Sequence, residues 1–224
     1  MEEHLNKTLK WAGLESEQPQ YLGGASSGSA YKVGKYVVKL TTSSAEARLA
    51  TRIVKVRHRN LYTVLQVGKI RLDRYMPSSR GNCVKNLYVI LYEYLQPATK
   101  EMQRAASWFI RMDPEEFESE ALRYLKDFPQ EDKKSLISYW FRNASLALGS
   151  DVIHGWHTDP DTFLKSGVFK HAKALLEVYK WTKDKGITLV DIYGGNVCRR
   201  GQDIVVIDPI GGATKTRFKV EDIA

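Results

Sequence analysis

The chain has 224 residues, a mass of 25.5 kDa and a formal net charge of +8 at neutral pH. This length corresponds to one domain or one two-lobed unit, and it is enough to bury a hydrophobic core. No apolar run approaches the ~20 residues that cross a bilayer, and the start lacks the apolar core of a signal peptide. The two cysteines, Cys83 and Cys198, stand far apart. We therefore expect a cytoplasmic protein without a disulfide framework, a CxxC metal site or a membrane partner.

The first forty residues predict a helix and then a β-hairpin. Residues 1–19 contain a short amphipathic pattern, with Leu5 and Leu9 on its apolar side, followed by a polar linker. Two strand-like runs then meet at a turn, Gly34-Lys35. Because side chains alternate along a strand, Val37 and Lys39 are predicted to share one face of the second strand.

Residues 42–54 predict a helix that begins at an N-cap, Ser43. Glu46 stands three residues later, which is the spacing of a capping box. It is also the only acidic residue between Lys39 and Asn60. The helix and its exit are strongly basic, which predicts either a solvated face or a surface for an acidic protein or a nucleic acid. The basic residues are Arg48, Arg52, Lys55, Arg57 and Arg59.

The remaining pattern predicts an α+β protein. Residues 61–70 and 86–95 read as strands, Pro97 marks a boundary, and residues 98–186 read as helical, with caps at Asp113 and Asp159 and a last helix over 161–185. We expect an N-terminal unit, residues 1–96, with one helix at its start, a glycine-rich loop, a five-stranded sheet and one further helix. Residues 97–224 would form a helical unit that carries a second hairpin.

That second hairpin carries polar groups suited to phosphoryl transfer. Its strands are predicted at 196–198 and 204–207, with a polar turn between them. Asp191 precedes the hairpin, Asn196 begins it and Asp208 follows it. Phosphoryl transfer uses one carboxylate to accept the proton of the acceptor hydroxyl, while an amide oxygen and a second carboxylate hold Mg²⁺.

The stretch Leu22–Leu40, LGGASSGSAYKVGKYVVKL, resembles the glycine-rich loop and lysine-bearing strand of protein kinases. Gly23, Ala25 and Gly28 occupy the G-x-G-x-x-G positions, with Ala25 replacing the middle glycine. Tyr36-Val37-Val38-Lys39 matches the V-A-I-K strand. The order of loop, lysine, helix, hinge, Asp191, Asn196 and Asp208 along the chain is also the kinase order.

This resemblance implies a bilobal protein-kinase-like fold with a small antiparallel β N-lobe and a truncated helical C-lobe, and a site for ATP and Mg²⁺. Asp191 would be the catalytic carboxylate, Lys39 would bind the phosphates, and Glu46 would pair with Lys39, in competition with its predicted capping role. Asn196 and Asp208 would bind the metal. The ATP-binding residues implied are Gly23, Gly24, Ala25, Ser26, Ser27, Gly28, Ala30, Val37, Lys39, Glu93 and Leu95, with Tyr92 in the gatekeeper place.

The departures from the kinase pattern indicate an atypical member. GITLVD stands where kinases carry GIVHRD, DPIG replaces DFG, and the sequence ends too soon after Asp208 for a full activation segment. The motifs are most similar to compact phage-encoded serine/threonine kinases and, second, to fructosamine-kinase-type enzymes. The resemblance implies phosphorylation of Ser or Thr in a host protein or in the chain itself. The alternatives are a small-molecule (sugar or amine) kinase and a pseudokinase that binds a partner through its basic surface.

Overall fold

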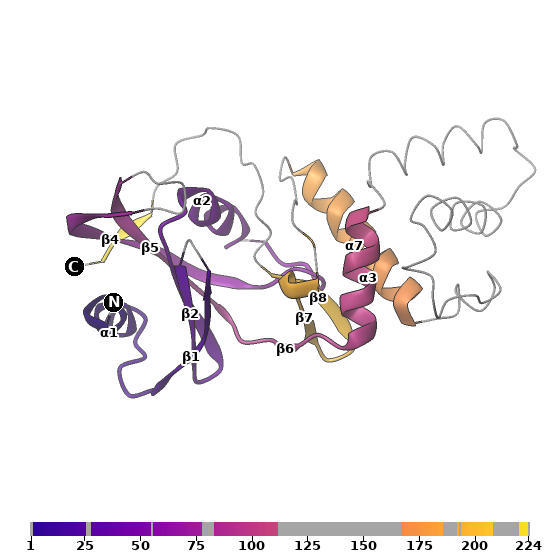
Figure 1. Ribbon diagram of the computed structural model, residues 1–224, viewed down its shortest axis with the longest axis horizontal. Helices are drawn as coiled ribbons and strands as arrows, with labels where there is room; N and C mark the ends of the chain where they lie inside the picture. Colours follow the sequence, from indigo (N-terminus) through magenta and orange to yellow (C-terminus); the bar gives the residue numbers. More distant parts are fainter. Residues whose placement is uncertain are drawn as a thin grey trace, which may run out of the picture.

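The computed structural model describes residues 2–25, 28–54, 56–77, 83–111, 167–185, 192, 194–207 and 220–223. Figure 1 shows a twisted sheet with helices α1 and α2 at one end of the molecule, and helices α3 and α7 with a small second sheet at the other. We call these two parts the N-lobe and the C-lobe. The predicted α+β class is confirmed, with a mainly antiparallel sheet in the N-lobe and helices in the C-lobe.

The N-lobe sheet has six strands in the order β1-β2-β3-β5-β4-β9. Neighbouring strands are antiparallel except β9, which runs parallel to β4. The sheet thus has six strands where five were expected. The strands located from the sequence correspond to β2, β3, β4 and β5, whereas β1 was not located separately and β9 comes from the end of the chain. The bounds are β1 Pro19–Ala25, β2 Gly28–Val33, β3 Tyr36–Thr41, β4 Val64–Pro77, β5 Cys83–Glu93 and β9 Glu221–Asp222.

Two predicted strands differ from the observed ones at both ends. The strand expected over 61–70 begins at Val64 and runs to Pro77, because β4 and β5 continue as a paired ladder beyond their apolar stretch, with Met76 opposite Val84. The strand expected over 86–95 ends at Glu93, so Leu95 lies past it. In both places backbone pairing, and not side-chain hydrophobicity, sets the limit.

The side chains of β3 alternate between the two faces of the sheet, as the sequence predicts. Val38 and Leu40 are fully buried against the apolar side of α1, Glu2–Trp11, where Leu5 and Leu9 lie. Lys39 is on the other face, which it shares with its cross-strand partners in β2 and β5. The amphipathic N-terminal helix is confirmed, and it covers the side of the sheet that faces away from α2.

The C-lobe is built around two packed helices, α3 (Lys100–Arg111) and α7 (Gly167–Asp184). A second sheet, in the order β6-β7-β8, lies beside them. Its bounds are β6 Gln96–Pro97, β7 Val197–Arg200 and β8 Asp203–Val206, with a 3₁₀ turn η2, Gly194–Asn196, before β7. The caps predicted at Asp113 and Asp159 lie outside the described residues.

The predicted hairpin is present, but the limits of both strands differ from the expected 196–198 and 204–207. Asn196 belongs to η2 and not to β7, because the chain is still turning when it reaches this residue. The connecting turn is shorter than predicted, and Gly201 occupies it with φ of +62°, a left-handed conformation that favours glycine.

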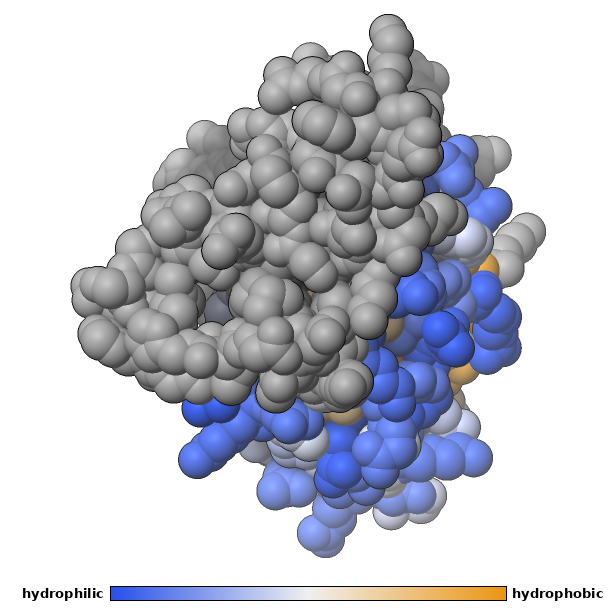
Figure 2. Space-filling model, turned by 90° about the vertical axis from the view of Figure 1, so that its right-hand side faces the viewer, coloured by the Kyte–Doolittle hydropathy of each residue, from blue (hydrophilic) through white to orange (hydrophobic). Residues whose placement is uncertain are grey.

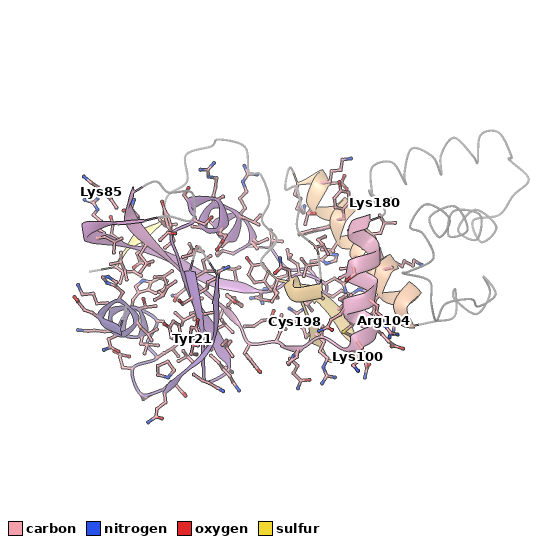
Figure 3. All side chains as sticks on the ribbon, viewed as in Figure 1. Tyr21, Lys85, Lys100, Arg104, Lys180 and Cys198 are labelled. Carbon is pink, nitrogen blue, oxygen red and sulfur yellow. The ribbon has the colours of Figure 1, made fainter. Side chains whose placement is uncertain are left out.

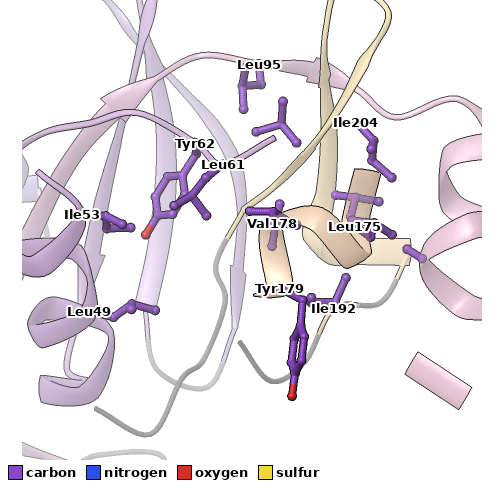
Figure 4. Close-up of a cluster of buried hydrophobic side chains, with 14 of the residues drawn as sticks. Leu49, Ile53, Leu61, Tyr62, Leu95, Leu175, Val178, Tyr179, Ile192 and Ile204 are labelled. Carbon is purple, nitrogen blue, oxygen red and sulfur yellow. The ribbon is translucent and has the colours of Figure 1, made fainter. Parts of the chain in front are cut away.

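One hydrophobic core joins the two lobes. Figure 4 shows side chains from α2, from the segment before β4, from α7 and from the β7–β8 hairpin packed together. Leu61 and Ile204 are almost fully buried in it, although they come from opposite lobes. The outer surface is different: on the C-lobe side, the described residues in Figure 2 are mostly hydrophilic. Within the described ranges, no helix is both long and apolar enough to cross a membrane.

Candidate active site

Lys39 and Glu46 form an ion pair under the sheet. The Lys39 Nζ to Glu46 Oε2 distance is 2.9 Å, and the side chains are only 14% and 5% exposed. The helix α2, Ser44–Ile53, brings Glu46 to this place because Ser43 caps it, with Ser43 Oγ accepting the Glu46 backbone N–H at 3.3 Å.

Two roles for Glu46 were predicted, and its contacts separate them. A capping box would need the Glu46 carboxylate to accept the Ser43 backbone N–H. That N–H instead donates to Thr41 Oγ1 at 3.0 Å. The cap therefore uses the Glu46 backbone, while the carboxylate lies against Lys39.

The glycine-rich loop is a hairpin between β1 and β2. Ala25 pairs with Gly28, and Ala30 lies between Gly23 on one side and Lys39 on the other. Gly23 has φ of +151°, and a Cβ added there would have nothing within 4 Å, so the backbone is open for the approach of a ligand. Ser26 and Ser27, at the tip of this hairpin, lie outside the described residues.

Gly28 is needed for a structural reason. A Cβ there would collide with the Leu40 carbonyl oxygen and would lie 2.9 Å from Thr41 Cα, both in the backbone of β3. Because backbone atoms of a paired strand cannot move aside, β2 can approach β3 this closely only with glycine. Gly24 is less restricted, since its Cβ would meet the far end of the exposed Tyr21 side chain at 2.7 Å; Figure 3 labels Tyr21.

The predicted adenine-binding side of the sheet is continuous with Lys39. Val37 is opposite Tyr92, and both side chains are on the face that carries Lys39. Tyr92 packs edge-on against Tyr62, with ring centroids 5.3 Å apart. At the hinge, Leu95 is buried.

The hinge is also held by a lysine that the sequence did not mark. Tyr94 donates its backbone N–H to the Lys35 carbonyl at 3.0 Å, and Lys32 Nζ lies 4.3 Å from the centre of the Tyr94 ring. Lys32 is opposite Val37, on the Lys39 face of the sheet. The Glu93 carboxylate has other partners, among them the Thr63 backbone N–H, which it accepts at 2.7 Å.

Asn196 lies at the base of the β7–β8 hairpin. It is 8% exposed, and its carbonyl accepts the Ile207 backbone N–H at 2.9 Å, which closes the hairpin one residue before Asp208. A Cβ at Gly194 would be 3.5 Å from Gln103 in α3, so η2 sits directly on that helix. Asp191 and Asp208 lie outside the described residues, and their predicted roles stay predictions.

The described residues fit ATP with Mg²⁺ better than a thiolate-bound metal. Lys39 supplies an ammonium for phosphate, and the Asn196 side chain carries the hard oxygen that Mg²⁺ prefers. Burial raises the pKa of the Cys198 thiol to about 11, so this side chain stays protonated at neutral pH; Figure 3 labels it on β7. Among the described side chains, no three or more His, Cys, Asp or Glu residues gather into a metal-binding group.

The predicted basic surface is partly used within the molecule. Arg57 and Arg59 are exposed. Arg59 Nη2 lies 3.3 Å from Glu177 Oε2 in α7 and so connects the exit of α2 to the C-lobe.

No model of a known protein family matches the chain, and no curated protein matches it. Among solved structures, it is similar to a spectinomycin phosphotransferase, APH(9)-Ia, in complex with ADP and spectinomycin, at 13% identity, covering 92% of this chain and 68% of that chain, with a TM-score of 0.35. It is also similar to the ADP-bound aminoglycoside phosphotransferase APH(2'')-Ib, at 12% identity, covering 93% of this chain and 69% of that chain, with a TM-score of 0.31. Similarity at this level identifies no substrate for the present chain.

Proposed function

We propose that this chain is an ATP- and Mg²⁺-dependent phosphotransferase of the protein-kinase-like class. The observation that carries the proposal is the Lys39–Glu46 ion pair beneath the glycine-rich hairpin. Removing a charge pair from water costs free energy that packing alone does not return. A pair of this kind is therefore expected where its ammonium binds a ligand. For Lys39 we propose that this ligand is the phosphate oxygens of the nucleotide, bound on the open side of the glycine-rich hairpin.

Each residue of the proposed site has a distinct task. Lys39, held by Glu46, neutralises the phosphates of the nucleotide, and the glycine-rich hairpin covers them. Asn196 and Asp208 hold Mg²⁺, which supplies positive charge on the phosphate oxygens when bound. Asp191 accepts the proton of the acceptor hydroxyl as this hydroxyl attacks.

We propose Ser or Thr hydroxyls of a protein as the acceptor, in a host protein or in the chain itself, and a cytoplasmic setting where ATP is present. Ser26, Ser27 and Ser29, in or beside the loop over the phosphates, are candidate self-acceptors. Phosphate on these serines would place negative charge against the nucleotide and inhibit the enzyme.

Transfer of labelled phosphate from γ-labelled ATP separates the acceptor classes. The wild-type chain would be incubated with ATP and Mg²⁺ alone, with a panel of proteins, and with a panel of aminoglycosides and sugar amines. We expect label on protein Ser or Thr, located by mass spectrometry, and far slower labelling with the Asp191→Asn variant. Label on a small molecule alone would establish the small-molecule kinase instead, and ATP binding without transfer to any acceptor would indicate a pseudokinase.

A further inference from the structure

The end of β5 is tied to the C-lobe by a charged residue of the β7–β8 hairpin. Arg200, at the end of β7, donates from Nε to Glu93 Oε2 at 3.1 Å, and its Nη2 donates to Glu93 Oε1. Thr63 donates its backbone N–H to the same Oε1 at 2.7 Å. The two charged side chains are 34% and 26% exposed. Glu93 is thus held on both of its oxygens at the hinge.

Arg200 also reaches the segment that leads into β4. Its Nη1 donates to the Arg59 carbonyl at 2.8 Å, and its Nη2 lies 3.2 Å from the Leu61 carbonyl and 3.4 Å from Thr63 Oγ1. A guanidinium carries five N–H donors in a fixed planar fork, so it can reach acceptors that are spread over two segments, whereas the three donors of an ammonium leave from one nitrogen. A lysine has one charged centre and would keep the attraction to Glu93 while losing most of this set.

The opposite strand of the hairpin is attached to the same segment. The Asn60 side chain donates to the Ile204 carbonyl at 2.7 Å, and the Asn60 carbonyl accepts the Val206 N–H at 2.9 Å. Tyr62 then donates its N–H to the Val206 carbonyl at 3.1 Å. Residues 60–63 therefore contact both strands of the hairpin, one through backbone pairing and the other through Arg200.

We infer that Arg200 is a positioning residue for phosphoryl transfer, because it fixes the β7–β8 hairpin, with Asn196 at its base, to the hinge and to the N-lobe that carries Lys39. This inference rests on the function proposed above. Arg200 contacts no reacting atom in this assignment. Its effect is to keep the metal-binding end of the hairpin in register with Lys39, and small displacements of such groups have large effects on rate.

The charge state of Glu93 agrees with this role. Burial alone would raise the pKa of the Glu93 carboxyl, but the hydrogen bonds from Arg200 and Thr63 outweigh it and hold the pKa below its ordinary value of 4.5. The carboxylate is therefore charged throughout the neutral range. A carboxyl with a lowered pKa stabilises the fold at every pH above its unfolded-state pKa, and this contribution is lost as the pH falls through the folded-state pKa. The contact between Glu93 and Arg200 is therefore intact at neutral pH, where phosphate transfer would be measured.

Arg200→Lys tests the inference, with Arg71→Lys as the matched control. Arg71 is 78% exposed and lies 3.8 Å from Asp222 at the far edge of the N-lobe sheet. We expect Arg200→Lys to lower kcat about tenfold or more, which corresponds to ~1.4 kcal/mol, while the affinity for ATP without Mg²⁺ stays at the wild-type value. Glu93→Gln should also lower kcat, and the loss in the double variant should be smaller than the sum of the two single losses, because both changes weaken one connected set of contacts around Arg200.

The outcomes separate this inference from the proposed function. Wild-type kcat in Arg200→Lys, or an equal loss of kcat in Arg71→Lys, would overturn the positioning role. If the wild-type protein transfers no phosphate at all, the proposed function has failed. Amide hydrogen exchange at Tyr62 and Val206 then tests separately whether Arg200 attaches the hairpin to the N-lobe. Faster exchange in Arg200→Lys than in Arg71→Lys would support the attachment of the hairpin by Arg200, and equal exchange would reject it.

Discussion

Asp191→Asn is expected to bind ATP and Mg²⁺ nearly as well as the wild type and to transfer phosphate about 10²- to 10⁴-fold more slowly. Asparagine has the same shape as aspartate but cannot accept the proton of the attacking hydroxyl. The loss should therefore appear in kcat, since an interaction that acts in the transition state alone leaves nucleotide binding unchanged. Single-turnover transfer and an ATP titration on the same protein would measure both quantities.

The matched control for this prediction is Asp184→Asn, at the exposed end of α7. It makes the same chemical change and should keep wild-type kcat. Undiminished transfer by Asp191→Asn would reject the assignment of the catalytic carboxylate.

Glu46→Gln is expected to slow transfer at least tenfold, about 1.4 kcal/mol in the barrier, and also to destabilise the protein without nucleotide. Gln is accepted at N3 of a helix, and the cap at Ser43 uses only the Glu46 backbone, so helix α2 itself should be unaffected. The expected loss of stability comes from the burial of Glu46, which is 5% exposed, because Gln would leave the Lys39 ammonium without its counter-charge. Breaking a buried pair costs roughly 3–5 kcal/mol, and the partial exposure of Lys39 favours the lower end.

A double variant distinguishes the stability effect from the rate effect. In Lys39→Met with Glu46→Leu, two apolar side chains of similar volume replace the pair, and thermal unfolding should return close to wild type. Phosphate transfer should remain lost, because no ammonium reaches the nucleotide. Normal turnover by Glu46→Gln would show that Lys39 works without this carboxylate.

Local signals in the sequence were enough for the elements that carry the site. The cap at Ser43, the turn at Gly34 and the alternation along β3 each depend on neighbouring residues only, and the structure has all three. Together they place Lys39 over Glu46. The same signals could not decide what the Glu46 side chain contacts, because the answer depends on Thr41, whose hydroxyl takes the Ser43 N–H.

Contacts between distant parts of the chain were not predictable from the sequence. Arg200 and Glu93 are 107 residues apart, and an arginine in a short polar turn reads as a solvated side chain. The strand β9 has two residues and no apolar pattern of its own; it pairs with the edge of β4, and the next residue, Ile223, is buried in the N-lobe core. The roles proposed for four residues outside the described ranges are based on the sequence and its kinase resemblance alone. These residues are Asp191, Asp208, Ser26 and Ser27. The particular closeness to phage-encoded or fructosamine-type kinases also stays a prediction.

The most direct test of the account is the thermal unfolding of the protein with and without millimolar ATP and Mg²⁺. A ligand that binds only the folded state raises the melting temperature by mass action. We predict a clear increase for the wild type, dependent on both ATP and Mg²⁺, and a much smaller one for Lys39→Ala. No increase for the wild type at any ATP concentration up to the millimolar range would contradict a nucleotide site between the glycine-rich hairpin and the β7–β8 hairpin.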